Sequence, residues 1–332
     1  MTFIYIATDR PGAGKTAAAL GLAAHLLSQG KRAAYAKLFS GNPAGDPDVA
    51  FAAQRFPGAA IAQPDFPFPL SDLASNSAQA LNKVKTSLTP HMSRYEAVVV
   101  EGPSLVGPAG DMSGISKQAV QTLGAKAVLV ARYEKGVAAD TLRAKALSLG
   151  TSAGVIINMV PRYRLCEVQQ ALAPLGKQFL GAIPEDRVMM APTLGQVARQ
   201  LNAQWVMGQE KSEVLLESFL IGGNIMDSGT TYFGRNEAKA VVVRGDRPDL
   251  QLAALREPLR ALILTGGHEP VEYIFHEVET RNTPLIITPH DTHGTSNTLG
   301  ALLESVSVRH PAKISRFQDL LNQYCNIPAL IA

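Results

Sequence analysis

The amino-terminal segment constrains the fold more than any other part of the sequence, because an apolar run, a glycine-rich loop and a helical pattern follow one another there. Phe3–Ala7 is apolar and partly β-branched, which predicts a buried strand. Thr16–Gln29 places aliphatic residues at helical spacing, and Gly30 follows as a candidate C-cap. In such a unit, loop N–H groups and the positive end of the helix bind phosphate oxygens. The segment therefore predicts a phosphate-binding loop.

The end of this loop, Gly-Ala-Gly-Lys-Thr, matches the end of the P-loop motif. Lys15 is expected to reach the outer phosphates of ATP, and the Thr16 hydroxyl is expected to bind Mg²⁺. The residues expected to contact the nucleotide in this segment are Gly12, Ala13, Gly14, Lys15, Thr16 and Ala17. The strict motif has a glycine where this chain has Asp9, so a turn that only caps an ordinary helix stays open as an alternative.

Length and composition fit a globular chain of two domains. The chain has 332 residues, of which 46% are hydrophobic and 18% are charged, and domains have roughly 100 to 200 residues each. The net charge of +3 gives no electrostatic case for nucleic acid or a membrane as partner. No signal peptide is recognisable, and Cys166 and Cys325 lie in no disulfide or metal motif. We therefore expect a cytoplasmic protein.

Alternating strand and helix patterns predict an α/β fold. Over residues 1–205 we expect a parallel sheet of the P-loop NTPase type with helices on both faces. Asn42–Pro69 is rich in Pro, Gly and Asp and is expected to be a loop region with one short helix, Val49–Arg55. After the first strand, further strands are expected at Ala33–Leu38, Ala97–Glu101, Ala127–Ala131, Gly154–Asn158 and Phe179–Ile183.

A smaller α/β domain is expected over residues 206–332, after a partly helical joint at Pro184–Ser218 that includes Trp205. His290, Asp291 and His293 are too loosely spaced for a zinc site and are interpreted as loop or helix-cap residues. The strands of this domain are expected at Ala240–Val243, Ala261–Leu264 and Pro284–Thr288, and its helices at Asp249–Leu255, Val271–Arg281, Leu299–Ser305 and Ser315–Cys325.

Charged side chains end two of the predicted strands beside the loop. Glu101 follows the apolar run Ala97–Val100, and in an open parallel sheet the carboxyl ends of strands face the ligand crevice. Glu101 can there bind Mg²⁺ directly or through water, or form a plain salt bridge. Lys37 ends the second strand, where it can stabilise charge on a transferred phosphoryl group or, again, form a salt bridge.

Several spaced segments resemble the dethiobiotin-synthetase-like ATPases, and more closely the first and middle parts of the long bacterial phosphate acetyltransferases. These segments are the P-loop, Tyr35–Gly41, Val98–Pro103 and Val155–Pro161. Later segments resemble a DRTGG-type domain, which implies a regulatory or oligomerising role. They are Phe219–Gly223, Gly245–Asp249 and Ala261–Gly267. Acetyl transfer in the long enzymes belongs to a further domain, so phosphate acetyltransferase activity is not expected here.

The first resemblance implies roles for individual residues. It assigns Glu101 to Mg²⁺, together with an acid at Asp46 or Asp48, of which we favour Asp48, although both can be turn residues. It assigns Lys37 to the carboxylate or carbamate that is phosphorylated. It assigns the Asn158 amide to the adenine edge, with a turn-forming asparagine as the alternative.

Two further points concern neighbouring loops. The Gly-Ala-Gly-Gly run that follows the acid in dethiobiotin synthetases is replaced by Gly102–Leu105, which alters the substrate loop. The P-loop also resembles the K-G-G-x-G-K-T loop of dimer-forming ATPases that position cell-division sites. There a lysine at the position of Arg10 crosses to the partner's nucleotide, and arginine offers a similar charged fork. This implies a homodimer, while an exposed loop arginine is the alternative.

These features predict Mg-ATP binding with slow hydrolysis or phosphoryl transfer to a small carboxylate, with Lys15, Lys37 and Arg10 in catalytic roles. The alternative is a non-catalytic sensor, in which ATP binding changes the assembly and the DRTGG-type domain reports it to a protein partner. A cobyrinate-type amidotransferase is discounted, because neither cysteine lies in a glutaminase motif.

Overall fold

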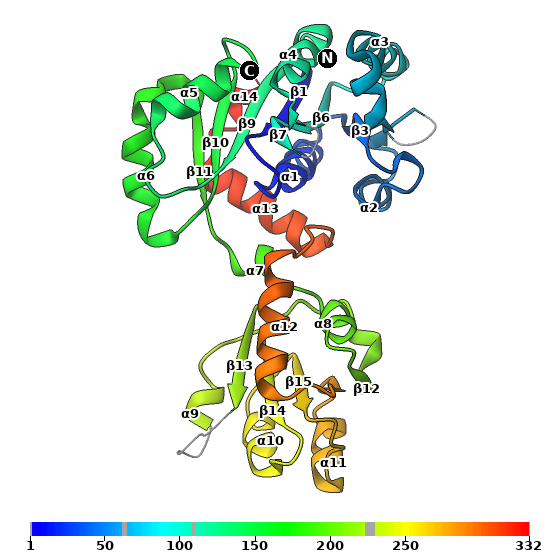
Figure 1. The fold of residues 1–332 in the computed structure, drawn as a ribbon, viewed down its shortest axis with the longest axis vertical. Coiled ribbons are helices and arrows are strands. Elements are labelled where there is room, and N and C mark those ends of the chain that lie inside the picture. The colour runs from blue at the N-terminus through cyan, green and yellow to red at the C-terminus, as the bar shows by residue number, and fades with distance from the viewer. Residues whose placement is uncertain (1, 62–64, 108–109, 223–229, 332) are drawn as a thin grey trace. The chain divides into compact units, whose positions relative to one another are not determined.

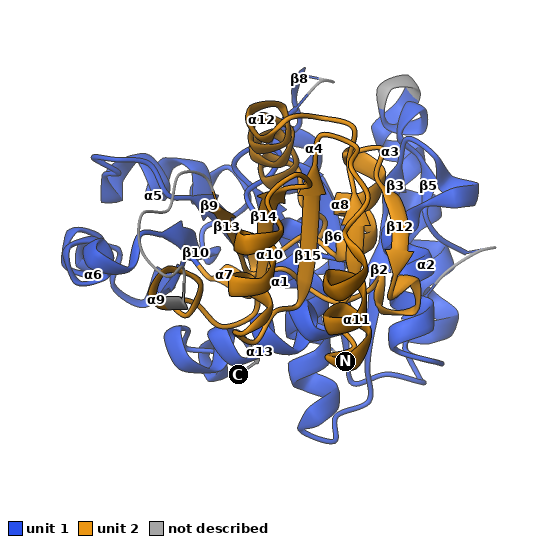
Figure 2. Ribbon diagram, turned by 90° about the horizontal axis from the view of Figure 1, so that it is seen from below, with its two compact units in different colours: residues 1–185, 308–332 blue, residues 186–307 orange. Residues whose placement is uncertain are grey.

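The computed structural model describes residues 2–61, 65–107, 110–222 and 230–331. The chain divides into two compact units: residues 1–185 with 308–332 form unit 1, and residues 186–307 form unit 2 (Figures 1 and 2). A single boundary is predicted after residue 205, whereas the chain leaves unit 1 after residue 185 and returns to it at residue 308. Across these described ranges, no helix combines the length and apolar character needed to cross a lipid bilayer.

A seven-stranded parallel sheet forms the centre of unit 1, in the order β11-β10-β9-β1-β6-β2-β4. Its strands are β1 (Thr2–Thr8), β2 (Ala33–Lys37), β4 (Ala60–Ile61), β6 (Ala97–Ser104), β9 (Lys126–Arg132), β10 (Gly154–Val160) and β11 (Phe179–Pro184). The strands that were predicted from apolar runs in this unit are therefore confirmed. The strand predicted at Ala97–Glu101 is longer than expected, because β6 continues past Glu101 to Ser104.

Helices cover both faces of this sheet, as the fold class predicts. Side chains alternate along a strand, so Tyr5 and Ala7 of β1 join the core under α3 to α6, while α1 packs against β6 and α13. The helices of unit 1 are α1 (Lys15–Ser28), α2 (Pro47–Arg55), α3 (Leu70–Leu88), α4 (Ser113–Leu123), α5 (Ala139–Leu147), α6 (Leu165–Leu172), α13 (Pro311–Tyr324) and α14 (Pro328–Ile331).

The segment expected to be mostly loop, Asn42–Pro69, holds more structure than predicted. Asp46 accepts hydrogen bonds from the backbone of Asp48 and Val49 and so caps α2. Two short pairs of strands form separate sheets of their own: β3 (Phe39–Ser40) with β5 (Phe68–Pro69), and β7 (Val106–Gly107) with β8 (Gly110–Asp111).

Helix α13 belongs to unit 1, not to the second domain in which it was predicted. Phe317 is buried against α1, where Gly21 leaves room for it: a Cβ on Gly21 would lie 2.8 Å from the Phe317 ring. The backbone of Asn326 also donates to the Leu180 carbonyl of β11. Residues after 307 therefore complete the core of unit 1, although they lie far in sequence from the rest of that unit.

Unit 2 contains a five-stranded sheet in the order β12-β16-β15-β14-β13, in which only the β12–β16 pair is antiparallel. Its strands are β12 (Gln204–Met207), β13 (Ser218–Gly222), β14 (Lys239–Arg244), β15 (Ala261–Thr265) and β16 (Leu285–Ile287). Its helices are α7 (Arg187–Met190), α8 (Leu194–Gln200), α9 (Thr230–Phe233), α10 (Pro248–Leu255), α11 (Glu272–Thr280) and α12 (Thr292–Glu304).

Two expectations for this region need correction. The joint predicted at Pro184–Ser218 instead supplies α8 and β12 to unit 2, and Trp205 pairs with Ile286 inside the sheet. The predicted helix Leu299–Ser305 is only the second half of α12. The cap interpretation of Asp291 is confirmed, because its side chain accepts from the Gly294 backbone at the start of α12.

Candidate nucleotide site

The backbone between β1 and α1 makes two left-handed turns at glycine. Gly12 and Gly14 have φ of 73° and 94°, values that residues with side chains rarely adopt. Gly14 is also the N-cap of α1, and no side chain caps that end of the helix. The first turn of α1 has no acidic residue, so its N–H groups and partial positive charge remain for an anion.

Asp9, the departure from the strict motif, anchors the start of the loop. Its buried carboxylate accepts hydrogen bonds from the Arg132 backbone at 3.1 Å, from Lys145 Nζ at 3.2 Å and from Arg10 Nε at 3.1 Å. These bonds tie the loop to the carboxyl end of β9 and to α5. A glycine at this position could not make them.

The strand register gathers the next side chains at one edge of the sheet. Glu101 of β6 is in register with Lys37 of β2 on one side and with Ile6 of β1 on the other. All three strands are parallel, so their carboxyl ends lie at the same edge as the loop that follows β1. The sequence-based expectation that Glu101 and Lys37 lie beside this loop is thus met in the fold.

Glu101 uses both carboxylate oxygens. Its Oε1 accepts from Thr16 Oγ1 at 3.0 Å and lies 3.9 Å from Lys15 Nζ, and its Oε2 accepts from the Tyr35 hydroxyl at 2.7 Å. Only 2% of Glu101 is exposed, so the carboxylate is held by these partners and not by water. Tyr35 was not expected at the site, and its position on β2 directly beside β6 explains its contact.

Burial controls the ionisation of these partners. Burial, followed by the charge of Glu101, raises the pKa of Tyr35 well above its usual value, so its hydroxyl stays a donor. Burial also lowers the pKa of Lys15, and the charge of Glu101 opposes this shift. A phosphate next to Lys15 would supply the second negative charge that a buried ammonium lacks.

Lys37 lies between two carboxylates of the segment that follows β2. Its Nζ is 2.8 Å from Asp46 Oδ2 and 2.7 Å from Asp48 Oδ2. Burial disfavours its charge, but the charge of Glu101 and the hydrogen bonds to both aspartates raise the pKa of Lys37 overall. Lys37 is therefore a protonated, half-buried cation at the carboxyl end of β2.

Asp46 and Asp48 differ in the hydrogen bonds that they form within the protein. Burial opposes ionisation of Asp46, yet hydrogen bonds from Lys37 and Ser40 lower its pKa, and its other oxygen caps α2. Asp48 has no capping role, and its Oδ1 is 2.9 Å from Arg309 Nη1. Arg309 carries no motif in the sequence, and it reaches the site because the chain returns to unit 1 just before α13.

Asn158 lies against the loop. Its Nδ2 donates to the Ala13 carbonyl at 3.0 Å, and a Cβ on Gly14 would lie 2.3 Å from that same nitrogen. Asn158 is buried at the carboxyl end of β10. In this structure its amide supports the P-loop backbone, a contact that sequence reasoning did not foresee.

Arg10 is engaged within its own chain. Its guanidinium contacts Asp9 and the exposed Glu134, and the hydrogen bond to Glu134 is the main cause that raises the pKa of Arg10. The side chain is 35% exposed. It lies at the entrance of the loop and makes no contact with the Glu101 cluster among the interactions of the described residues.

A Mg²⁺ ion fits the donor set at this edge of the sheet. Thr16 Oγ1 and Glu101 Oε1 are two oxygen donors 3.0 Å apart, and Mg²⁺ binds through one or two protein oxygens, waters and phosphate oxygens. Within the described residues, no cluster of three or more His, Cys, Asp or Glu side chains could hold a metal by itself. The residues thus suit a metal that arrives with a phosphate group.

Comparisons with known proteins agree with this arrangement. The AAA domain model (AAA_26) matches residues 2–193, and the DRTGG domain model matches residues 196–302. Phosphate acetyltransferases of Nitratidesulfovibrio vulgaris and Synechocystis sp. are each 22% identical, over 357 and 348 residues, with 97% and 96% of this chain covered. The chain spans 50% of each of these relatives.

Similar solved structures include MinD cell division protein of Aquifex aeolicus, with a TM-score of 0.38, 16% identity, and coverage of 56% of this chain and 83% of that chain. The CBS and DRTGG domains of Clostridium perfringens pyrophosphatase give a TM-score of 0.31 and 22% identity, and cover 38% of this chain and 53% of that chain.

Proposed function

We propose that this chain, which belongs to the AAA domain family, binds Mg-ATP at the loop between β1 and α1 and transfers or slowly hydrolyses its terminal phosphate. The observation that carries the proposal is the convergence of Lys15, Thr16, Glu101 and Lys37 beside an uncapped helix start. A P-loop, an oxygen pair for Mg²⁺ and a second lysine are the parts that phosphoryl transfer requires.

Each residue has a part in this proposal. The N–H groups of Gly12–Thr16 and the Lys15 ammonium hold the outer phosphates, and Thr16 and Glu101 hold Mg²⁺, which neutralises phosphate charge when bound. Tyr35 keeps the Glu101 carboxylate in place. Lys37 stabilises negative charge that develops on the transferred group, because its raised pKa keeps it protonated.

The acceptor we propose is a small carboxylate. Two carboxylates of the chain already bind the Lys37 ammonium, and this chemical compatibility supports the proposal. Asp46 is fixed as a helix cap, so a substrate carboxylate would displace Asp48, whose remaining partner is Arg309. Asp48 would then be free to turn toward Mg²⁺, as its family position implies.

A nucleotide-dependent regulator is the second candidate, and one observation favours it. The residues after Glu101 continue as strand β6 to Ser104, and a Cβ on Gly102 would lie 2.1 Å from the Tyr5 hydroxyl. This segment is part of the sheet, whereas dethiobiotin synthetases have a glycine-rich substrate loop there. A chain without an acceptor loop would use ATP as a switch and signal through its DRTGG domain.

Measuring ATP turnover separates the two candidates. The full chain is incubated with Mg-ATP alone and with a panel of small mono- and dicarboxylates, and phosphate release and acyl phosphate are quantified. Phosphoryl transfer predicts that at least one carboxylate raises turnover several-fold. Turnover that no carboxylate changes, together with tight ATP binding, contradicts phosphoryl transfer to a carboxylate and supports the switch.

Replacing Glu101 with glutamine tests the proposed metal site. Glutamine keeps the size of glutamate but has a single acceptor oxygen, so it can accept from only one of Thr16 and Tyr35, and it lacks the charge that attracts Mg²⁺. We expect the Mg²⁺ concentration for half-maximal ATP binding to rise about tenfold, a loss of about 1.4 kcal/mol, while metal-free ATP binding changes less. Glu96→Gln, on the exposed residue before the same strand, is the control. A titration that overlays the parent curve would assign Glu101 a structural role.

Arg10 is proposed to act across a dimer, because it stands where the dimer-forming ATPases have the lysine that crosses to the partner's nucleotide. Isologous dimers are also the commonest assemblies. We expect Arg10→Ala to lower ATP turnover about tenfold or more, since arginine charge stabilises phosphoryl transfer, and to leave the oligomeric state unchanged. Light scattering and turnover are measured beside the exposed control Arg94→Ala. A monomeric parent chain at micromolar concentration would refute the dimer, and unchanged turnover would refute the role of Arg10.

A further inference from the structure

At the carboxyl edge of the sheet in unit 2, the connections that follow neighbouring strands lead to helices on opposite faces. Helices α10 and α11, which follow β14 and β15, share a core with one set of strand side chains, whereas α12, which follows β16, shares the core of the opposite face with α8. The loops after β15 and β16 therefore run to opposite faces. In open parallel sheets, ligands bind in the crevice that such a divergence leaves.

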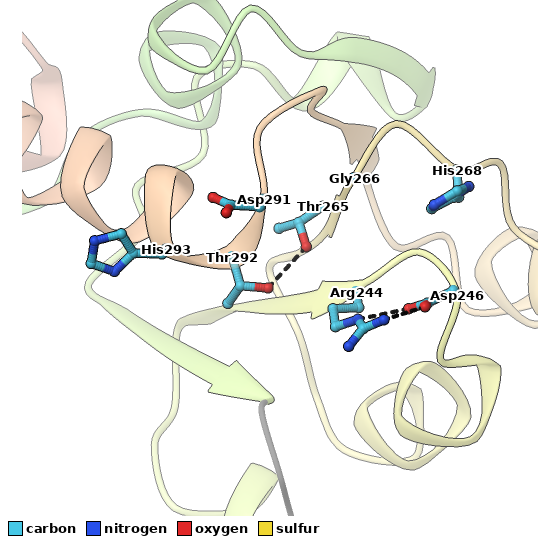
Figure 3. Close-up of a pocket in the computed structure, with 8 residues that line it drawn as sticks. All are labelled: Arg244, Asp246, Thr265, Gly266, His268, Asp291, Thr292 and His293. Atoms are coloured by element: carbon cyan, nitrogen blue, oxygen red, sulfur yellow. Dashed lines mark hydrogen bonds and ion pairs between the residues drawn. The ribbon is translucent and has the colours of Figure 1, made fainter.

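A pocket of about 500 Å³ lies at this point (Figure 3). Its walls come from the ends of β14 and β15 and from the start of α12, which is the divergence just described. The volume is in the range of sites that hold ordinary metabolites, about 300–1,000 Å³. It lies wholly within unit 2 and shares no residue with the nucleotide site.

The pocket contains hydrogen-bond donors suited to an anion. Thr265 and Thr292 place their hydroxyls 3.1 Å apart, as Figure 3 shows, and Thr265 is only 2% exposed. Thr292 is the first residue of α12, whose N-terminus is already capped by the Asp291 carboxylate, so the donors that Thr292 and Thr265 offer to a ligand are their hydroxyls. Arg244 reaches the pocket from the end of β14 with 60% of its side chain exposed.

Arg244 already binds a carboxylate in the geometry that an anionic ligand would use. Its Nε is 2.8 Å from Asp246 Oδ1, and a second bond joins its Nη2 to Asp246 Oδ2. Asp246 occupies these two donors, and the remaining N–H groups of the Arg244 guanidinium can donate to a phosphate. The carboxylates of Asp246 and Asp291 can in turn accept hydrogen bonds from hydroxyl groups of a ligand.

The backbone around these groups is fixed in unusual conformations. Gly266 has φ of 88°, and a Cβ on Gly245 would lie 2.8 Å from His268 Cβ. The buried Gln251 donates from Nε2 to the carbonyls of Arg244 and Gly245 at 2.9 and 3.0 Å. These features hold the pocket wall rigidly before any ligand arrives, which lowers the cost of binding.

We propose that this pocket binds a small phosphorylated metabolite of mononucleotide size, with its phosphate at Arg244, Thr265 and Thr292 and its hydroxyl groups at the two aspartates. Such a ligand would give the DRTGG domain an input of its own. The inference goes beyond the P-loop function and does not depend on it.

Histidine side chains report on this site directly, because His268 and His293 line the pocket and His25 lies in unit 1. The full-length Lys15→Ala chain, labelled in its histidines, is titrated by NMR with AMP, with inorganic phosphate and with adenosine, in phosphate-free buffer. We expect AMP to shift the His268 and His293 signals saturably and to leave His25 unchanged. Phosphate should compete with AMP, and adenosine should bind at least about tenfold more weakly, equivalent to about 1.4 kcal/mol.

Arg244→Gln should weaken AMP binding at least about tenfold, whereas Arg256→Gln, an exposed arginine outside the pocket, should not. The fluorescence of Trp205, the single tryptophan and a residue of β12, checks that unit 2 stays folded in each variant. The proposal is overturned if AMP gives no saturable shift at millimolar concentration, if adenosine binds as well as AMP, or if Arg244→Gln binds like the parent.

Discussion

Replacing Lys15 with alanine is expected to lower the affinity for ATP about 100-fold or more. A hydrogen bond to a charged group contributes about 1.5–3 kcal/mol, and Lys15 is the cation in line with the glycine turn and the start of α1. Burial lowers its pKa in the ligand-free chain, and a phosphate beside Lys15 would offset this desolvation of its charge. Binding is measured with a fluorescent ATP analogue and by competition with ATP.

The fold should tolerate this substitution, because among the described residues the ion pair of Lys15 is a long one, of 3.9 Å to Glu101. Removing a largely buried ammonium also removes the cost of its desolvation. Circular dichroism and the unfolding midpoint establish that the variant is folded. Lys177→Ala, an exposed lysine of unit 1, is the matched control and should bind ATP normally. A folded Lys15→Ala chain with nearly the parent affinity would contradict the P-loop assignment.

Replacing Phe317 with alanine is expected to lower the free energy of unfolding of unit 1 by about 3–5 kcal/mol, the usual cost of deleting a buried phenylalanine ring. Phe317 is 2% exposed and packs at Gly21 of α1, the helix whose first turn forms the phosphate site. Loss of the ring leaves a cavity under α1, so ATP binding should weaken along with stability. Urea unfolding followed by circular dichroism measures the effect.

Phe275→Ala is the matched control for Phe317. Phe275 is 40% exposed in unit 2, so the free energy of unfolding should change by about 0.5 kcal/mol or less. A shortened chain that lacks residues 308–332 should lose stability at least as severely as Phe317→Ala. Equal stability of Phe317→Ala and Phe275→Ala would contradict the packing of α13 on α1.

Local sequence patterns were sufficient to predict the parts of the fold that depend on near neighbours. The apolar run Phe3–Ala7, the glycine-rich loop and the helix that follows are consecutive, so their spacing alone predicts a strand, a turn and a helix. The position of Glu101 and Lys37 followed from the same reasoning, because a charged residue that ends a buried strand of a parallel sheet lies at its carboxyl edge.

Contacts between distant segments could not be predicted in this way. Arg309 meets Asp48 across 261 positions of sequence, and nothing local to either residue marks the pair. The packing of α13 on α1 depends on the fit between Gly21 and the Phe317 ring. A periodic pattern of apolar residues does not reveal such a fit. Gln204–Met207 is too short for a clear pattern and becomes a strand because β16 offers it an edge.

The contacts between side chains and backbone inside the site could not be predicted from the sequence either. Asn158 was expected to contact adenine, and the structure places its amide on the Ala13 carbonyl, a pairing set by the approach of β10 to the loop. Asp9 was seen only as a departure from the motif, yet its three donors make it an anchor of the loop. Both roles depend on where neighbouring strands end.

The most direct test of the account is calorimetric titration of the unaltered full chain with ATP, in the presence of Mg²⁺ and again with Mg²⁺ removed by a chelator. A P-loop supported by Lys15, Thr16 and Glu101 predicts saturable binding of ATP with equal numbers of nucleotides and chains, and clearly weaker binding without Mg²⁺. No saturable binding at millimolar ATP, or binding that is indifferent to Mg²⁺, would contradict the proposal that this edge of the sheet is a Mg-ATP site.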